Sequence, residues 1–160
     1  MWHAKLKALT LIELLVAIGI SVLLIVTAIP YFGGSSKKDD MSSKGNQVST
    51  FILRARNFAL NPDIDGKNAK QYIVQSTAEN SIKIVRIDLD SITPVDLGGE
   101  SLQLPDGYQV SLPSDIVFDS PTGALSGSSS VVVRVTKAKQ SSPSAVITIK
   151  KPGVADVALQ

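Results

Sequence analysis

The sequence predicts an α+β chain in which a long N-terminal hydrophobic helix continues into an amphipathic helix packed on antiparallel β-sheet. Three observations predict this class: an unbroken apolar run near the N-terminus, a following segment with helical periodicity, and a series of short β-rich runs separated by turn residues. Of the 160 residues, roughly 130 lie outside the apolar run, which suits one small domain with a modest core.

Composition excludes several classes of function. The 16 Lys+Arg and 14 Asp+Glu give a net charge of +2, and without Lys5 and Lys7 the two signs balance, so the body has no global attraction for nucleic acid or anionic lipid. There is no cysteine, which excludes disulfides and thiolate metal sites. His3 is the only histidine, and no serine has a base nearby in the sequence. We therefore expect no enzyme, cofactor or metal site.

The apolar run comes first. Between Leu9 and Ile29 only Glu13 is charged, and a helix of this length spans about 30 Å, one hydrocarbon thickness. Lys5 and Lys7 precede the run and no basic residue follows until Lys37, which predicts a cytoplasmic N-terminus and an extracytoplasmic body.

Three interpretations of this run compete. A secretory signal would use "VTA", residues 26–28, as its small-x-small site and leave Ile29 as the mature N-terminus. A plain signal anchor leaves Glu13 as an unexplained cost of roughly 2.5 kcal/mol at the bilayer midplane. The third interpretation explains that carboxylate.

The stretch "KALTLIELLVAIGI", from Lys7, resembles the type IV prepilin signature of a short basic leader, a small residue, an apolar first mature residue and a nearby glutamate. The family usually has Gly before the cut and Phe after it, where this chain has Ala8 and Leu9. Pro30 stands where many pilins carry a helix-bending proline.

The resemblance implies that a prepilin peptidase cuts between Ala8 and Leu9 and that a methylase modifies the new amino group of Leu9. The Glu13 carboxylate would then pair with the terminal ammonium of a neighbouring subunit, and such buried pairs are better evidence for register than for stability. The implied partners are the peptidase and methylase, other pilins or pseudopilins, the inner-membrane assembly platform, and membrane lipid before assembly.

The predicted organisation follows from this cut. We expect a prepilin leader at 1–8, a transmembrane or filament-core helix at 9–29, a bend or neck at 30–42, and a globular head at 43–160. Pro30 and the Gly and Ser residues after it predict the bend, since proline removes a backbone donor and crowds the preceding turn.

The head begins with an amphipathic helix at about 43–60. Ser42 or Ser43 can cap its start, and Asn61-Pro62 ends it, because the residue before proline avoids the α region. Its apolar stripe recurs at three- and four-residue steps, at Val48, Phe51, Ile52, Ala55, Phe58 and Ala59.

The β-rich part covers about 70–160. Irregular alternation near Val85 predicts a bulge or a strand buried on both faces. Predicted strands start at Gln71, Ser81, Tyr108, Ile116, Ser130, Ala145 and Val154, with turns at 79–80, 98–99, 105–107, 121–123 and 152–153.

The head is most similar to the H-type minor pseudopilins (GspH) and FimT-like minor pilins. The resemblance rests on "FILRARNFALN" with Arg56 and Ala59, on "IVFDSPTG" at 116–123, and on "AVITIKKPGVADV" from Ala145. It implies a minor pilin or pseudopilin, a structural subunit of a type IV pilus or a type II secretion pseudopilus. The alternative is a static membrane-anchored extracytoplasmic binding module, an adhesin or a DNA-uptake receptor.

Two weaker features have ordinary explanations. A basic patch of Arg134, Lys137, Lys139, Lys150 and Lys151 is typical of a solvated sheet edge, and the arginines that FimT-like proteins use on DNA are absent after Gly153, so DNA is not an expected partner. "NPDIDG", from Asn61, starts like a calcium loop, but Tyr72 occupies the position of the bidentate glutamate. A helix-ending loop explains it better.

Overall fold

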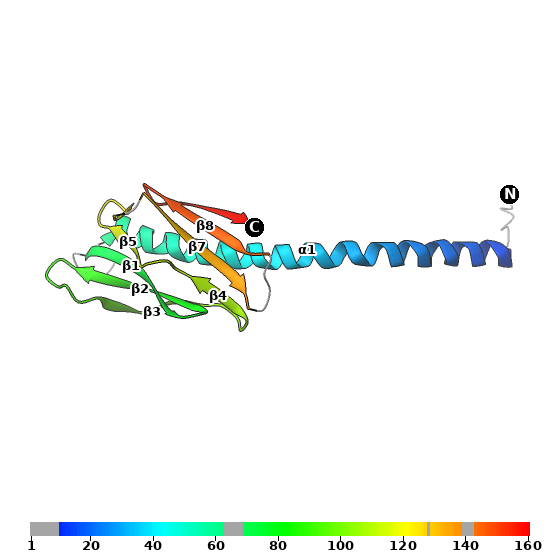
Figure 1. Cartoon of the computed structure of the whole chain (residues 1–160), viewed down its shortest axis with the longest axis horizontal. Coiled ribbons are helices and arrows are strands. Elements are labelled where there is room, and N and C mark those ends of the chain that lie inside the picture. The colour runs from blue at the N-terminus through cyan, green and yellow to red at the C-terminus, as the bar shows by residue number, and fades with distance from the viewer. Residues whose placement is uncertain (1–9, 63–68, 128, 139–142) are drawn as a thin grey trace, which may run out of the picture. The chain divides into compact units, whose positions relative to one another are not determined.

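The computed structural model describes residues 10–62, 69–127, 129–138 and 143–160, with side chains of 27–35 left out of the description. The chain forms two compact units, residues 1–37 and 38–160. The elements, labelled in Figure 1, are one helix, α1 (Leu11–Leu60), and the strands β1 (Ala69–Ala78), β2 (Ser81–Asp88), β3 (Val95–Gln103), β4 (Tyr108–Ser111), β5 (Ile116–Asp119), β6 (Ala124–Leu125), β7 (Ser130–Lys137), β8 (Ala145–Lys150) and β9 (Val154–Leu159).

Helix α1 ends at Leu60, immediately before Asn61-Pro62, as the sequence predicts. No separate helix begins at residue 43, which corrects the predicted start, because helical structure continues through 30–42. Packing explains the earlier start of the head helix, since Met41 is already buried in the core and Asp40 accepts a hydrogen bond from Tyr108. The bend expected at Pro30 stays a prediction.

The strands form two antiparallel sheets. Sheet A has the order β3-β2-β1-β5-β6, and sheet B has the order β4-β7-β8-β9. Figure 1 shows the head part of α1 between the green strands of sheet A and the orange strands of sheet B. The sheets are joined where the β1–β2 turn meets the start of sheet B: the Val110 amide donates to the Glu79 carbonyl at 2.7 Å. The α+β class is thereby confirmed, with two sheets.

The apolar stripe of α1 supplies the centre of the core. Five of its six predicted members are buried, and Phe58 is half-buried against the Tyr72 ring, with centroids 5.8 Å apart. Gly45 lets the helix approach sheet B closely, because a Cβ there would stand 2.7 Å from Ala145 Cβ and 3.2 Å from Val157 Cγ1. The strongest core contributions come from Val48, Ile52, Val74, Ile82, Ile84, Leu104, Ile116, Phe118, Leu125, Val133, Ile147 and Ile149.

Strand β3 is not among the predicted strands, because Gly98-Gly99 in its middle is a turn signal. Both glycines have positive φ, 53° and 99°, and the β2–β3 register shifts between Lys83 and Val85. The pair therefore sits in an irregular strand and not in a turn between two. Val85 is buried, at 2% exposure, although it lies outside the main core cluster. Its burial and the shift in register confirm the irregularity predicted near Val85.

Arg56 of α1 joins the two sheets to the helix. Its Nε donates to the Gly123 carbonyl at 3.2 Å, in the β5–β6 turn of sheet A. A Cβ on Gly153, in the β8–β9 turn of sheet B, would stand 2.7 Å from Arg56 Nε and 2.9 Å from the Gly123 oxygen. Both turns thus approach one side chain. A Cβ on Gly153 would meet Arg56, whereas a Cβ on Gly123 would first meet Leu60 Cγ, at 2.8 Å.

We expect Gly153→Ala to destabilise the head more than a substitution that only strains the backbone. Gly153 has φ +108° and no space for a Cβ, whereas Gly99 has φ +99° and no atom within 4 Å of the point where a Cβ would stand. Gly99→Ala should cost about 1–2 kcal/mol for the backbone alone. Gly153→Ala should cost roughly 1–3 kcal/mol more, from overpacking against Arg56.

The measurement is urea unfolding of the full chain in detergent, followed by circular dichroism. Equal losses for Gly153→Ala and Gly99→Ala would show that the close approach to Arg56 contributes nothing beyond backbone strain.

Candidate assembly site

Thr10 and Glu13 cap the start of α1 by hydrogen bonding to one another. Thr10 Oγ1 accepts a hydrogen bond from the Glu13 amide at 3.3 Å, and the Thr10 amide and hydroxyl both donate to Glu13 Oε2 at 3.0 Å. This is a capping box, in which residues three apart satisfy backbone donors that the helix leaves free. In the isolated chain, Glu13 already has polar partners within its own first turn.

The first turns of α1 present apolar side chains that are largely exposed. All twelve large hydrophobic residues between Leu11 and Val26 are between 54% and 79% exposed. Glu13 is the only charged residue in that stretch. Among the residues whose placement is described, none makes up a helix of the length and apolarity that crossing a membrane requires.

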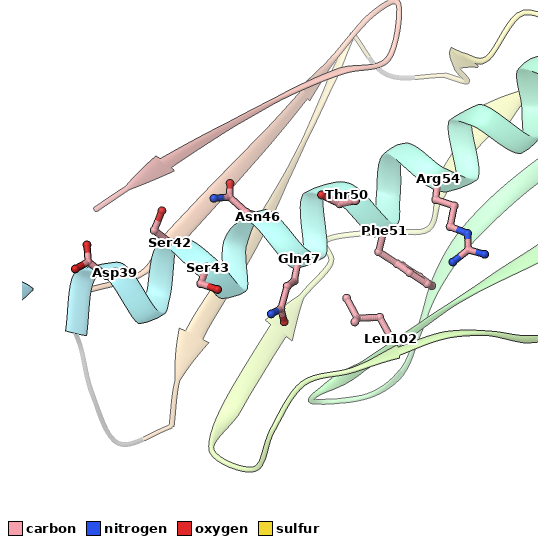
Figure 2. A pocket seen from close by; sticks show the side chains of 9 residues that line it. All are labelled: Asp39, Ser42, Ser43, Asn46, Gln47, Thr50, Phe51, Arg54 and Leu102. Carbon is pink, nitrogen blue, oxygen red and sulfur yellow. The ribbon is translucent and has the colours of Figure 1, made fainter. Parts of the chain in front are cut away.

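A groove of about 660 Å³ runs along α1 beside β3 in the head. Figure 2 shows Phe51 and Leu102 pointing toward one another at its apolar part. The Arg54 guanidinium is held at one end of the lining by Glu100, at 2.7 Å. The remaining lining is polar and comes from the helix: Asp39, Ser42, Ser43, Asn46, Gln47 and Thr50.

A second cluster fixes the other flank of α1 to sheet B. The Tyr108 hydroxyl of β4 donates to Asp40 Oδ2, and Lys137 Nζ of β7 lies 3.9 Å from the same oxygen. Lys137 and Lys44 also lie over the Tyr108 ring, 5.2 Å and 6.0 Å from its centroid. The hydrogen bond to Asp40, and then burial, raises the pKa of Tyr108 above its ordinary value.

The predicted basic patch is divided by the sheet. Arg134 and Lys150 share the outer face of sheet B, but Lys150 pairs with Ser130, four residues from Arg134, a spacing of about 13 Å. Lys150 is also 3.9 Å from Asp156. Lys137 belongs to the other face, with Tyr108, and Lys151 is exposed in the β8–β9 turn. The described members therefore form no continuous cationic surface.

Several predicted positions fall outside the described residues. These are the cleavage and methylation residues Ala8 and Leu9, Lys139 of the basic patch, and Asp63 and Asp65 of the calcium-like loop. Within the described part of the chain, no group of three or more His, Cys, Asp or Glu side chains gathers as a metal site would require.

The capping box is absent from the sequence interpretation, although its signal is present. Thr10-x-x-Glu13 directly before an apolar run is the T-x-x-E pattern of a helix start. The prediction for Glu13 names only a partner in another subunit and omits its hydrogen bonds with Thr10.

Comparison with known proteins identifies the type of fold. The chain matches no protein-family model, and no curated protein sequence matches it significantly. Two crystal structures of the Pseudomonas aeruginosa type IV minor pilin FimU are similar to it. One aligns with TM-score 0.58 and 11% identity over 77% of this chain and 91% of FimU; the other aligns with TM-score 0.54 and 10% identity over 72% and 90%. The fold is therefore pilin-like.

We expect Tyr108→Phe to lower the stability of the head by about 1.5–3 kcal/mol at neutral pH, the contribution of a hydrogen bond to a charged group. The folded pKa of Tyr108 is raised above its unfolded value of about 10, so this contribution is complete below pH 10 and is lost as pH rises through the folded pKa.

Urea unfolding of the full chain and of Tyr108→Phe, at pH 7 and at several pH values above 10, measures the difference. The gap between the two proteins should shrink in the alkaline range. A gap that stays constant or widens there would contradict the role of the Tyr108 hydroxyl as donor to Asp40.

Proposed function

We propose that this chain is a minor pilin or pseudopilin, a structural and non-catalytic subunit that assembles into a type IV pilus or type II secretion pseudopilus through its N-terminal helix. The single observation that carries the proposal is the apolar surface of residues 11–26, whose twelve large hydrophobic side chains are each 54–79% exposed. Patches of this size mark contacts with protein or lipid. The pilin-like fold supports the same role.

The capping box gives Glu13 two successive partners in this proposal. Before assembly the carboxylate is satisfied by Thr10, which lowers the cost of holding it in an apolar environment. After cleavage between Ala8 and Leu9, the ammonium of a neighbouring subunit would compete for the same oxygens. A charged pair then replaces, or is added to, hydrogen bonds that are already formed, so the carboxylate is never left without a partner.

The rest of the route follows from the prepilin resemblance. The N-terminus lies in the cytoplasm, the head lies outside, and the apolar segment rests in lipid until the assembly platform extracts it. Peptidase and methylase act on Ala8 and Leu9 before incorporation.

A static membrane-anchored binding module is the second candidate. The groove beside Phe51 and Leu102 favours it, because a concave surface of about 660 Å³ with an apolar part and polar sides is typical of ligand sites. In that case the N-terminal segment would only anchor the chain, and the head would act alone.

Glu13→Gln separates the charge of Glu13 from its capping role. Glutamine can also close a capping box, so the helix start should stay intact, but glutamine cannot neutralise an ammonium. We expect Glu13→Gln, like Glu13→Ala, to be exported and cleaved yet to fall in the filament fraction by at least about tenfold. The measurement is shearing of filaments and immunoblotting in the native host.

The comparison of the two variants gives the decisive outcome. If Glu13→Gln is incorporated like the unmodified chain while Glu13→Ala is not, Glu13 acts in assembly as a helix cap alone.

Mass spectrometry of the mature N-terminus separates the two candidate functions. A subunit processed by prepilin peptidase starts at methylated Leu9, a secreted domain starts at Ile29, and a fixed anchor keeps Met1. We expect methylated Leu9. An intact Met1 in cells that assemble filaments would favour the anchored binding module.

A further inference from the structure

The turn between β2 and β3, residues 89–94, exposes apolar side chains at one end of the head. Ile92 is 92% exposed and Leu89 is 61% exposed, and Val95 beside them is 37% exposed. Ile92 is more exposed than any other large hydrophobic residue described in the chain. Single exposed hydrophobic residues are ordinary, whereas exposed apolar side chains gathered on one turn form a patch of the kind that marks interaction sites.

Hydrogen bonds hold this turn in one shape. The Ser91 amide donates to the Asp88 carbonyl at 3.3 Å, the Thr93 amide donates to Ser91 Oγ at 3.1 Å, and the Ser91 and Thr93 hydroxyls lie 2.7 Å apart. Pro94 restricts the chain where the turn enters β3. A turn fixed before binding loses little conformational freedom on binding, which favours affinity.

The base of the turn is anchored in the head. Arg86, which is 3% exposed, forms an ion pair with Asp88 at 2.6 Å. Arg86 also pairs with Val95 across the two strands, directly below the turn. The turn therefore begins beside a buried arginine that is ion-paired to the last residue of β2.

Charge indicates the kind of partner. Residues 87–100 contain four acidic and no basic side chains. Asp88, Asp96 and Glu100 form ion pairs with Arg86, Lys83 and Arg54. Asp90, beside Leu89, is exposed and makes no ion pair or hydrogen bond with any described residue. An anionic lipid surface would repel this turn, whereas a cationic rim on a protein would attract it.

The turn also has a definite position. Asp88 pairs with Ala69, the first strand residue after α1, so the turn lies at the end of the head where the helix ends (Figure 1). The Asp40–Tyr108 contact marks the opposite end of the helix in the head. Within the head, the turn and the Asp40–Tyr108 contact therefore lie at opposite ends of the helix.

We propose that residues 89–94 dock into an apolar socket with a basic rim on a neighbouring subunit of the filament, with Ile92 and Leu89 as the inserted side chains. This inference rests on the proposed function. It adds a contact between heads to the contact between N-terminal helices. Ile92 supplies the buried area, and Asp90 selects a cationic rim.

Incorporation of full-length variants in the native host tests the proposal. We expect Ile92→Asp to be processed and to lose incorporation by about tenfold, as for a residue at the centre of an interface. Val154→Asp is the matched control, since Val154 is 53% exposed on β9 and undergoes the same chemical change. Val154→Asp should be incorporated normally. Asp90→Lys should reduce incorporation more than Asp90→Asn.

Photo-crosslinking identifies what the turn contacts and does not depend on the aspartate substitution. A benzophenone amino acid at position 92 should give a protein adduct that contains another pilin subunit, and the same group at position 154 should not. A phospholipid adduct alone at position 92, detected by mass spectrometry, would overturn the proposal in favour of membrane contact. Equal protein adducts at both positions would also overturn it.

Different results would refute the proposed function and the docking of residues 89–94. If the unmodified chain never enters the filament fraction, the proposed function fails. If it enters and Ile92→Asp enters equally well, only the docking of the turn is refuted. Unchanged thermal unfolding of Ile92→Asp shows that any loss is a loss of contact, because Ile92 has almost no surface buried in the head.

Discussion

The contact on which the head depends is the packing of Arg56 between two glycine turns. The Gly123 turn belongs to sheet A and the Gly153 turn to sheet B; Arg56 Nε donates to the Gly123 carbonyl, and a Cβ on Gly153 would meet both Arg56 and that carbonyl oxygen. Two sheets that are otherwise joined mainly at the β1–β2 turn and β4 are thereby closed at their other side as well. The three segments that resemble minor pilins and pseudopilins, around Arg56, Gly123 and Gly153, are distant in sequence and meet at this one place.

The apolar side chains of the chain lie in two environments, the buried core of the head and the exposed segment 11–26. In the head, the Ile, Val, Leu and Phe side chains of the core are buried at 0–8% exposure against α1 and the sheets. In residues 11–26, twelve comparable side chains are exposed. Covering each would contribute about 1.5–3 kcal/mol, so together they exceed the entire stability of a typical domain of about 5–15 kcal/mol. Covering this segment would therefore contribute more free energy than the folding of a typical domain.

Most of the head could be predicted from periodicity, and the exceptions have physical causes. The stripe from Val48 to Ala59 and the runs that form β1, β2, β7 and β8 carry strong patterns, so the sequence predicts them. Strand β3 escapes prediction because Gly98-Gly99 is a turn signal that pairing with β2 overrides. The predicted start of the head helix is too late, because burial of Met41 stabilises helix before Ser42 more than a cap at Ser42 would stabilise a helix start there.

The candidate site was less predictable than the fold, since its residues act through neighbours that sequence spacing does not reveal. The Thr10–Glu13 pair is local and is predictable from T-x-x-E. Tyr108 and Asp40 are 68 positions apart, and no pattern joins them. The basic residues form no continuous surface among those described, because strand alternation sends Lys137 and Arg134 to different faces.

Gly45 and Arg56 together determine how torque on the helix is transmitted to the head. They lie eleven residues apart, three turns and about 16 Å along α1, and both face the β8–β9 hairpin. At Gly45 the helix backbone touches Ala145 and Val157, and at Arg56 the side chain is locked beside Gly153. Contacts at these two levels oppose rotation of the helix about its own axis inside the head, so torque on residues 38–60 acts on the β8–β9 hairpin and, through Gly123, on sheet A.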